Sequence, residues 1–302
     1  MKRKLLVLSS AVALCFAAGS ASALTITTNV GATDAAAAAT LIPAVLAPSS
    51  GISVVGGTEF YQGTPTTPQS GTYTGFNLAP SSGSTPTLTL PNGILLTSGH
   101  SDMPATNTLN NFSNALTQPG SGANAQLGAL SASAGGTSTT NDANVISFSF
   151  TVDPGKTSVS AKFVFGTDEF PTQSVTDIFG FFVDGVNYAK FPGGELISNT
   201  PGNPTNFILN PVGSGLYGIE YNGLSQAFTV VGLLDPNVTT HTIMIGVADT
   251  SDSIYDSGVF IGGLLAGTDT GGGIGGEVPE PMTLVLVGLG LAGIGFSRRK
   301  RV

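Results

Sequence analysis

Two short acidic segments hold the side chains of this chain that are best suited to chemistry. Their carboxylates are Asp168, Glu169, Asp177, Asp249, Asp252 and Asp256. Both segments follow stretches with the alternation of a β-strand. Hard cations such as Ca²⁺ take six to eight oxygen ligands, and loops at one edge of a β-sandwich can supply them. The spacing is not that of an EF-hand, so the most specific hypothesis is a Ca²⁺ site built from two loops.

Turn formation is the alternative explanation of the same residues. An Asp side chain accepts hydrogen bonds from backbone N–H groups two residues further on, and this stabilises turns without any metal. Asp184, directly before Gly185, fits this explanation. For the two acidic segments the sequence leaves both explanations open.

Catalysis has little support among the remaining side chains. His100 and His241 are the only imidazoles, and neither a G-x-S-x-G nor an H-E-x-x-H motif is present. A carboxylate pair could hydrolyse glycosides, but the chain has no Trp to form the aromatic floor that is usual in sugar sites. We therefore expect no enzymatic activity.

The elements that position these residues are predicted to be strands, because apolar and small polar residues alternate with a period of two. The clearest stretches are Ile146–Val152, Ser158–Phe165, Asp177–Val183, Val186–Phe191, His241–Val247 and Val259–Leu265. Pro154-Gly155 predicts a turn that pairs the first two, and Asp184-Gly185 predicts a tight hairpin. This pattern predicts an all-β fold, an antiparallel β-sandwich of the jelly-roll kind.

The predicted sandwich domain covers residues 24–265, with weaker elements in its first half. Strands are expected at Ile52–Val55, Thr72–Leu78 and Ile94–Thr97, after a helix from Thr33 to about Ile42 that Pro43 would end. Residues 113–144 are rich in Ser, Ala, Gly, Thr and Asn, which predicts a long surface loop or a disordered insertion. Residues 266–277 contain six glycines and predict a flexible linker.

Residues 1–23 have the three parts of a secretory signal peptide. The basic segment Lys2–Lys4 precedes the apolar run Leu5–Ala17, and Ala21 and Ala23 form an A-x-A cleavage site. Cleavage after Ala23 removes Cys15, the only cysteine. We therefore expect an exported domain without disulfides, thiolate nucleophiles or cysteine metal ligands.

Residues 278–302 have a second three-part pattern: Pro279, Glu280 and Pro281, then the apolar run 282–296, then a basic tail. About fifteen apolar residues are few for a transmembrane helix, which usually needs about 20, but flanking residues and snorkelling arginines make a crossing feasible. The basic tail stays cytoplasmic by the positive-inside rule, which places the domain outside. A plain C-terminal anchor is the alternative.

This ending resembles the PEP-CTERM sorting signal of Gram-negative bacteria in the order, spacing and position of its parts. The resemblance implies that Pro279, Glu280 and Pro281 are recognised by an exosortase, a membrane protease that cleaves off the tail. It also implies a transient stay in the inner membrane, followed by delivery to the cell surface or the extracellular space.

Removing both ends leaves a strongly acidic domain. Residues 24–277 contain three lysines, no arginine and 17 carboxylates, for a net charge of −14. Nucleic-acid binding is excluded, because it depends on Lys and Arg that neutralise phosphates. The charge is compatible with divalent cations or simply with solubility.

Four further segments resemble the choice-of-anchor L domain, a bacterial surface module found with alternative C-terminal anchors. They are Phe163–Pro171, Asp177–Val183, Glu220–Ser225 and Ala248–Ile261, and Gly93–Gly99 also fits. The resemblance implies a location and an architecture. Two kinds of function remain open: a structural or interaction protein in a matrix of exopolysaccharide, as in a biofilm, or a Ca²⁺-dependent adhesin that binds a specific glycan, such as a surface polysaccharide, or a protein.

Overall fold

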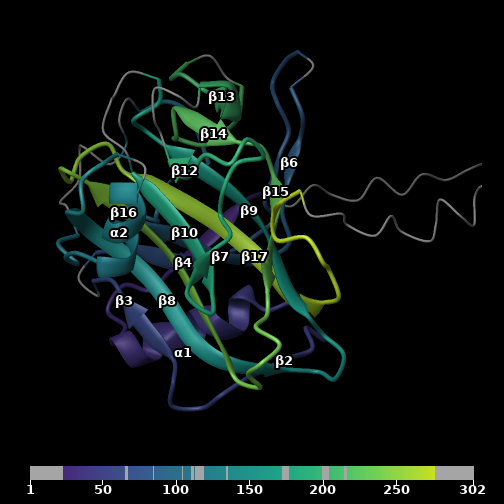
Figure 1. Ribbon diagram of the computed structural model, residues 1–302. Helices are drawn as coiled ribbons and strands as arrows, with labels where there is room; N and C mark the ends of the chain where they lie inside the picture. Colours follow the sequence, from purple (N-terminus) through teal and green to yellow (C-terminus); the bar gives the residue numbers. More distant parts are fainter. Residues whose placement is uncertain are drawn as a thin grey trace, which may run out of the picture.

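Two antiparallel sheets pack face to face in the computed structural model and form the predicted β-sandwich (Figure 1). The structure describes residues 23–275, apart from residues 65–66, 84, 104, 110–111, 113–118, 134, 172–176, 199–203 and 214–215. Every ladder between strands in this part of the chain is antiparallel.

The first sheet has nine strands in the order β1–β4–β7–β17–β9–β14–β13, with β15 beside β9 and β18 beside β15. Their bounds are β1 (Thr25–Thr28), β4 (Ser70–Thr74), β7 (Gly93–Thr97), β9 (Ser158–Thr167), β13 (Phe207–Leu209), β14 (Gly223–Ser225), β15 (Phe228–Leu233), β17 (Ser257–Gly267) and β18 (Gly273–Ile274).

The second sheet has seven strands in the order β11–β10–β16–β8–β2, with β12 beside β10 and β3 beside β8. Their bounds are β2 (Ile52–Val54), β3 (Phe60–Gln62), β8 (Thr140–Val152), β10 (Ile178–Val183), β11 (Val186–Asn187), β12 (Ile197–Ser198) and β16 (His241–Thr250). A separate ladder joins β5 (Asn77–Leu78) to β6 (Leu88–Thr89), and a short 3-10 helix, η2, spans Pro204–Asn206.

The main core lies between the sheets and follows from the alternation along their strands. Phe148 and Phe150 of β8 and Phe163 and Phe165 of β9 are all buried in it. Burying one such side chain stabilises the fold by about 1.5–3 kcal/mol. A second cluster, which includes Tyr73, covers part of the outer face of the first sheet.

The helix α1 (Asp34–Val45) packs against strands of both sheets. Thr33 caps it, because its hydroxyl accepts a hydrogen bond from the N–H of Ala36 at 3.3 Å. The prediction that Pro43 ends the helix is wrong by one turn, since Pro43 lies inside it. Leu41, Ile42 and Val45 are buried and hold this last turn against the core, which outweighs the hydrogen bond that Pro43 cannot make.

The pairing predicted across Pro154-Gly155 is also wrong. The strands on either side, β8 and β9, lie in different sheets: β8 pairs with β16, and β9 pairs with β17 and β15. The alternation still identifies the inward face of β9, because Val159 and Ala161 are in the main core. Alternation alone cannot distinguish two neighbours in one sheet from two strands that face each other.

The tight hairpin at Asp184-Gly185 is confirmed. Val183 pairs with Val186 across it, and the two turn residues have φ angles of 49° and 80°. Two positive φ angles are typical of a type I′ turn, in which Asp-Gly is favoured. The second strand of the hairpin is shorter than expected, since β11 ends at Asn187.

Residues 113–144 do not form one long loop or disordered insertion. Ala125–Ser133 form the helix α2, and β8 already begins at Thr140. Leu127 of α2 is fully buried on the outer face of the second sheet, in a cluster with Phe182 and Met244. The helix docks through only two large apolar residues, the fully buried Leu127 and the partly buried Leu130, which is why composition suggested a loop.

The segment predicted to be a flexible linker is partly ordered. The strand β17 continues to Gly267, and β18 adds Ile274 to the first sheet, opposite Val230 of β15. The last described residue is Gly275, so the remainder of this segment lies outside the described residues.

Candidate functional site

Four strand ends bring the predicted acidic residues together at one end of the sandwich. Asp168 and Glu169 follow β9, Asp177 precedes β10, and Asp249 lies near the end of β16. Asp252 and Asp256 lie in the connection from β16 to β17. The sheets are joined here by the hydroxyl of Ser257, which donates a hydrogen bond to Oδ2 of Asp177 at 2.6 Å.

Backbone hydrogen bonds hold the same segments in place. The N–H of Asp177 donates to Oε2 of Glu169 at 3.1 Å, across eight positions of the chain. The N–H of Asp168 donates to the carbonyl oxygen of Asp256 at 3.1 Å. The two acidic segments therefore form one assembly, which we call the carboxylate cluster: Asp168, Glu169, Asp177, Asp249, Asp252 and Asp256.

The carboxylate cluster is almost completely removed from solvent. Five of its members are at most 3% exposed, and only Asp252 is half-buried. Burial first, and then the charge of Asp177, raises the pKa of Glu169. Burial also raises the pKa values of Asp177 and Asp249 far above the ordinary Asp value, and Asp256 adds to both shifts. These groups can avoid mutual repulsion only by holding protons or by sharing a cation.

Asp249 is a fully buried member of the cluster whose carboxylate is poorly satisfied. Neither of its carboxylate oxygens makes a hydrogen bond of ordinary geometry among the described residues, although the nearby Ser98 hydroxyl lowers its pKa slightly against the effect of burial. One oxygen of Asp177 is in the same situation. Glu220, which is equally buried elsewhere, accepts hydrogen bonds from Thr108 N–H at 3.0 Å and Leu109 N–H at 2.8 Å. Buried carboxylates can thus be satisfied in this fold, and Asp249 is not.

The cluster is not a preformed metal centre. Among the described residues, no three His, Cys, Asp or Glu side chains are arranged so that they could hold one metal ion. The donor chemistry fits a hard cation, since carboxylate oxygens without hydrogen-bond partners point into a buried site. Side chains would have to move for several of them to coordinate the same ion.

Sequence reasoning missed three neighbours of the cluster. A Cβ atom on Gly99 would overlap the carboxylate of Asp256, so only glycine fits there. The ring of Tyr221 lies over Gly166 and Gly258, which pair between β9 and β17, and its pKa is raised by burial and then by Asp168. All three neighbours, Ser98, Gly99 and Tyr221, lie within segments that the resemblance covers, which was the available signal.

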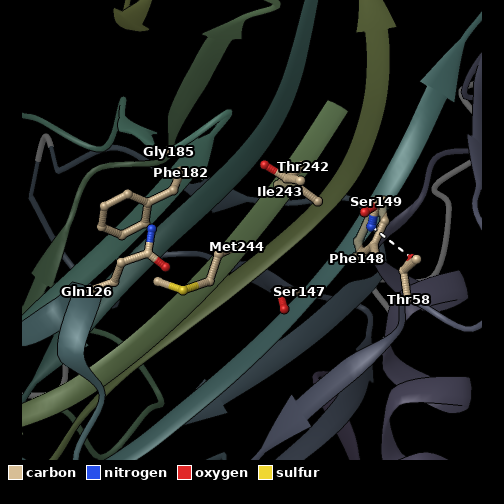
Figure 2. A pocket seen from close by; sticks show the side chains of 10 residues that line it. All are labelled: Thr58, Gln126, Ser147, Phe148, Ser149, Phe182, Gly185, Thr242, Ile243 and Met244. Atoms are coloured by element: carbon tan, nitrogen blue, oxygen red, sulfur yellow. Dashed lines mark hydrogen bonds between the residues drawn. The ribbon is translucent and has the colours of Figure 1, made fainter. Parts of the chain in front are cut away.

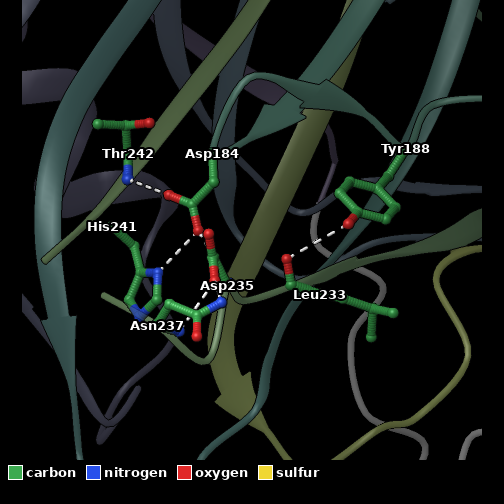
Figure 3. A network of polar contacts seen from close by, with 7 residues as sticks. All are labelled: Asp184, Tyr188, Leu233, Asp235, Asn237, His241 and Thr242. Atoms are coloured by element: carbon green, nitrogen blue, oxygen red, sulfur yellow. Dashed lines mark hydrogen bonds and ion pairs between the residues drawn. The ribbon is translucent and has the colours of Figure 1, made fainter. Parts of the chain in front are cut away.

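Asp184 and His241 form a different network, which Figure 3 shows. One oxygen of Asp184 accepts from Thr242 N–H at 2.8 Å, and the other contacts Nδ1 of His241 at 2.7 Å and Asp235 N–H at 3.2 Å. Burial alone would raise the pKa of Asp184, but these hydrogen bonds outweigh it and lower the pKa. The network ties a hairpin turn to β16, as expected for an Asp that stabilises a turn and a His with a structural role.

His100 and a small pocket are two further candidates for a reactive site. Nδ1 of His100 lies 3.5 Å from Oδ1 of Asp102, and the side chain is nearly buried. Figure 2 shows the pocket, about 240 Å³, on the outer face of the second sheet. Its floor includes Phe182 and Met244, and its rim carries hydroxyl and amide groups such as Gln126 but no titratable side chain. The described lining therefore offers no general acid and no base that could activate its hydroxyls.

The fold and the cluster define an antiparallel β-sandwich domain with a buried acidic end. The chain belongs to the choice-of-anchor L domain family, whose model matches residues 28–264. A second match, to the PEP-CTERM protein-sorting motif, covers residues 277–301. Searches of curated proteins and of solved structures found no match.

The sorting motif identifies the chain as an exosortase substrate that is exported to the cell surface. Pro279, Glu280 and Pro281, the cleavage-site residue Ala21 and the expected transmembrane segment 282–296 all lie outside the described residues. Ala23 is exposed at the start of the described chain. Neither helix within residues 23–275 is long and apolar enough to cross a membrane.

Proposed function

We propose that the mature domain is a non-catalytic structural or interaction module in the exopolysaccharide matrix, or biofilm, outside the cell. The observation that carries this proposal is the sorting motif directly after a folded β-sandwich domain. The proposed route starts with removal of the signal peptide after Ala23. The chain then stays briefly in the inner membrane through residues 282–296 until exosortase removes the tail.

Cosedimentation tests the matrix role. The mature protein, purified from the extracellular fraction, is mixed with exopolysaccharide isolated from the same cells and with neutral dextran as a control. We expect the protein to pellet with exopolysaccharide and to stay in solution with dextran. Equal recovery in the supernatant with both polymers would contradict the proposal.

A Ca²⁺-stabilised adhesin is the second candidate, and the unsatisfied oxygens of Asp177 and Asp249 favour it. Because the carboxylate cluster is buried, a cation there would stabilise the fold rather than bridge the protein to a glycan. Calcium at about a hundredfold its dissociation constant would stabilise the domain by about 2.7 kcal/mol. For a domain of this size, we expect the melting temperature to rise by roughly 5–10 °C.

The calcium candidate is tested by melting curves at one fixed pH with calcium, with magnesium and with chelator. Asp249→Asn should abolish the rise, whereas Asp153→Asn, which changes an exposed carboxylate at the β8–β9 turn, should keep it. Identical curves with calcium and with chelator would leave the carboxylate cluster without a cation. The matrix role would not be affected by that result.

A further inference from the structure

A groove on the outer face of the first sheet holds two of the three lysines of the exported domain. It has a volume of about 870 Å³ and runs across β15, β9 and β17, which lie side by side in Figure 1. Lys156 and Lys162 line it, together with the end of β17 and the segment before β7. The third lysine, Lys190, is not part of it.

The groove exists because the second apolar cluster covers only part of this face. Along β9, Ala161 and Phe163 point into the main core, while Ser160, Lys162 and Val164 face outward. Val164 is buried in the second cluster, but Lys162, two positions earlier, is exposed. The second apolar cluster therefore covers the outer face of β9 at Val164 but not at Lys162.

A bulge in β17 shapes the opposite wall. The register of β17 against β9 shifts between Gly262 and Leu265, and Gly263 has a φ of 71°. Beyond the bulge, Leu265 is 40% exposed on the groove side. An exposed apolar side chain beside lysines offers a contact surface for a ligand with both apolar and anionic groups.

The lysines of the groove are not neutralised by the protein. The ion pairs among the described residues involve His100 and His241, and no carboxylate lies within ion-pair distance of Lys156 or Lys162. Among the described residues of the lining, Asp269 is the only acidic one, and its carboxylate accepts a hydrogen bond from the Ser158 hydroxyl at 2.9 Å. The described lining therefore has two positive charges and one negative charge, whereas the domain as a whole has a net charge of −14.

The chemistry of the lining fits an acidic sugar polymer. Sugar rings present C–H faces, which suit Leu90, Pro91 and Leu265, and hydroxyls, which suit Ser160 and Thr229. A carboxylate on the sugar would pair with the lysines. A nucleic acid does not fit, because the domain has no arginine and is acidic overall.

We propose that this groove binds a carboxylate-bearing polysaccharide, with Lys156 and Lys162 as the cationic contacts. The proposal rests on the matrix role proposed above and names the ligand class. The two lysines provide selectivity for acidic over neutral polymers. The groove lies beside the first half of β9, whereas the carboxylate cluster follows the end of that strand, so the two sites can be tested independently.

Titration calorimetry with polygalacturonate, a linear polyuronate, tests the proposal. Full-length chains are expressed in an exosortase-bearing host, and their mature forms are purified from the extracellular fraction. We expect Lys156→Gln combined with Lys162→Gln to weaken binding about tenfold, because partly exposed ion pairs contribute little individually. Lys190→Gln makes the same kind of charge change at an exposed position outside the groove and should stay within about twofold of wild type.

Further arms separate the alternatives. Leu265→Asp should weaken binding, and added salt should do the same, because salt screens exposed charges. Dextran and polyglutamate serve as neutral and acidic-peptide controls, and unchanged melting temperatures show that the variants fold. Equal loss in Lys190→Gln, equal binding of polyglutamate, or no binding of polygalacturonate by wild type would each overturn the proposal.

The outcome also distinguishes this proposal from the one on which it rests. If wild type pellets with isolated exopolysaccharide and the lysine variants pellet equally well, the matrix role stands and the groove proposal fails. If wild type does not pellet with exopolysaccharide at all, the matrix role itself fails. If wild type pellets with exopolysaccharide and the double-lysine variant does not, the result supports both the matrix role and the groove proposal.

Discussion

At the scale of single residues, Asp184 and Asp249 show how surroundings decide the state of a carboxylate. Asp184 receives two backbone N–H groups and a histidine, so its charged form is favoured. Asp249 is completely buried beside other acids and has no comparable set of donors among the described residues. The first is a turn residue, whereas the second belongs to a group that needs protons or a cation.

Asp184→Asn tests whether the charged form of Asp184 stabilises the fold. Because the pKa of Asp184 is lowered by folding, its ionised form stabilises the fold above the unfolded value of 3.8, and this contribution disappears as the pH falls through the lower folded value. His241 and Asp235 are the titratable residues that face it. We expect a loss of about 1–2 kcal/mol in urea unfolding at pH 7 and a much smaller loss at pH 3.

Asp153→Asn is the matched control for this experiment, because Asp153 is an exposed carboxylate at another turn. It should change the free energy of unfolding by less than about 0.5 kcal/mol. An equal loss for Asp184→Asn at both pH values would mean that its charge contributes nothing to stability.

Gly99 makes a second prediction at this scale. Gly99→Ala places a methyl group where the Asp256 carboxylate lies, so one of the two must move. We expect a loss of about 1–3 kcal/mol, measured by denaturant unfolding. Gly56→Ala is the control, since that position is open and has no unusual φ. Equal stability of the two variants would show that the packing of Gly99 on Asp256 is not constrained.

At the scale of elements, the strands were predictable, but their partners were predictable only at the tight Asp184-Gly185 hairpin. The alternation in β8 and β9 identified the buried residues of both strands, because a strand with one buried face has a period of two. It could not assign the strands to opposite sheets, since both arrangements bury the same side chains. The tight hairpin was predicted because Asp-Gly specifies its turn locally.

The convergence of the carboxylate cluster could be suspected from sequence because its residues stand at strand ends. Its burial could not, since acidic loops are ordinarily exposed. The lysine groove was not predicted either. It depends on where the second apolar cluster stops along β9, and that boundary involves residues as distant in sequence as Tyr73 and Val164.

The helix α2 makes the prediction at this scale. Leu127→Ala removes the one fully buried leucine that docks the helix on Phe182 and Met244, and should cost about 2–5 kcal/mol in denaturant unfolding. Gln126→Ala, at an exposed position of the same helix, is the control and should change stability little. No loss in Leu127→Ala would mean that this segment behaves as the loop that its composition suggests.

At the scale of the whole molecule, most basic residues lie at the two ends of the chain and nearly all acidic residues lie between them. Seven of the ten basic residues lie in the two terminal segments, and residues 24–277 have a net charge of −14. The basic termini match the cytoplasmic side of a membrane, and the acidic domain matches the outside. Only three lysines are therefore left on the domain, and two of them share one groove.

The sorting motif makes the last prediction. Replacing Pro279, Glu280 and Pro281 by alanine should leave the protein in the inner membrane with its basic tail attached. Proline keeps the residue before it extended and interrupts a helix, whereas alanine would allow the helix expected at residues 282–296 to continue into the segment that the protease must recognise. Membrane fractionation and mass spectrometry of both termini provide the measurement.

Val278→Ala with Met282→Ala, directly outside the motif, is the matched control and should be processed like wild type. The same experiment checks the other end of the chain, since cleavage after Ala23 gives a mature N-terminus at Leu24 in every variant. Release of the triple-alanine variant at the wild-type rate would show that these three residues do not direct sorting.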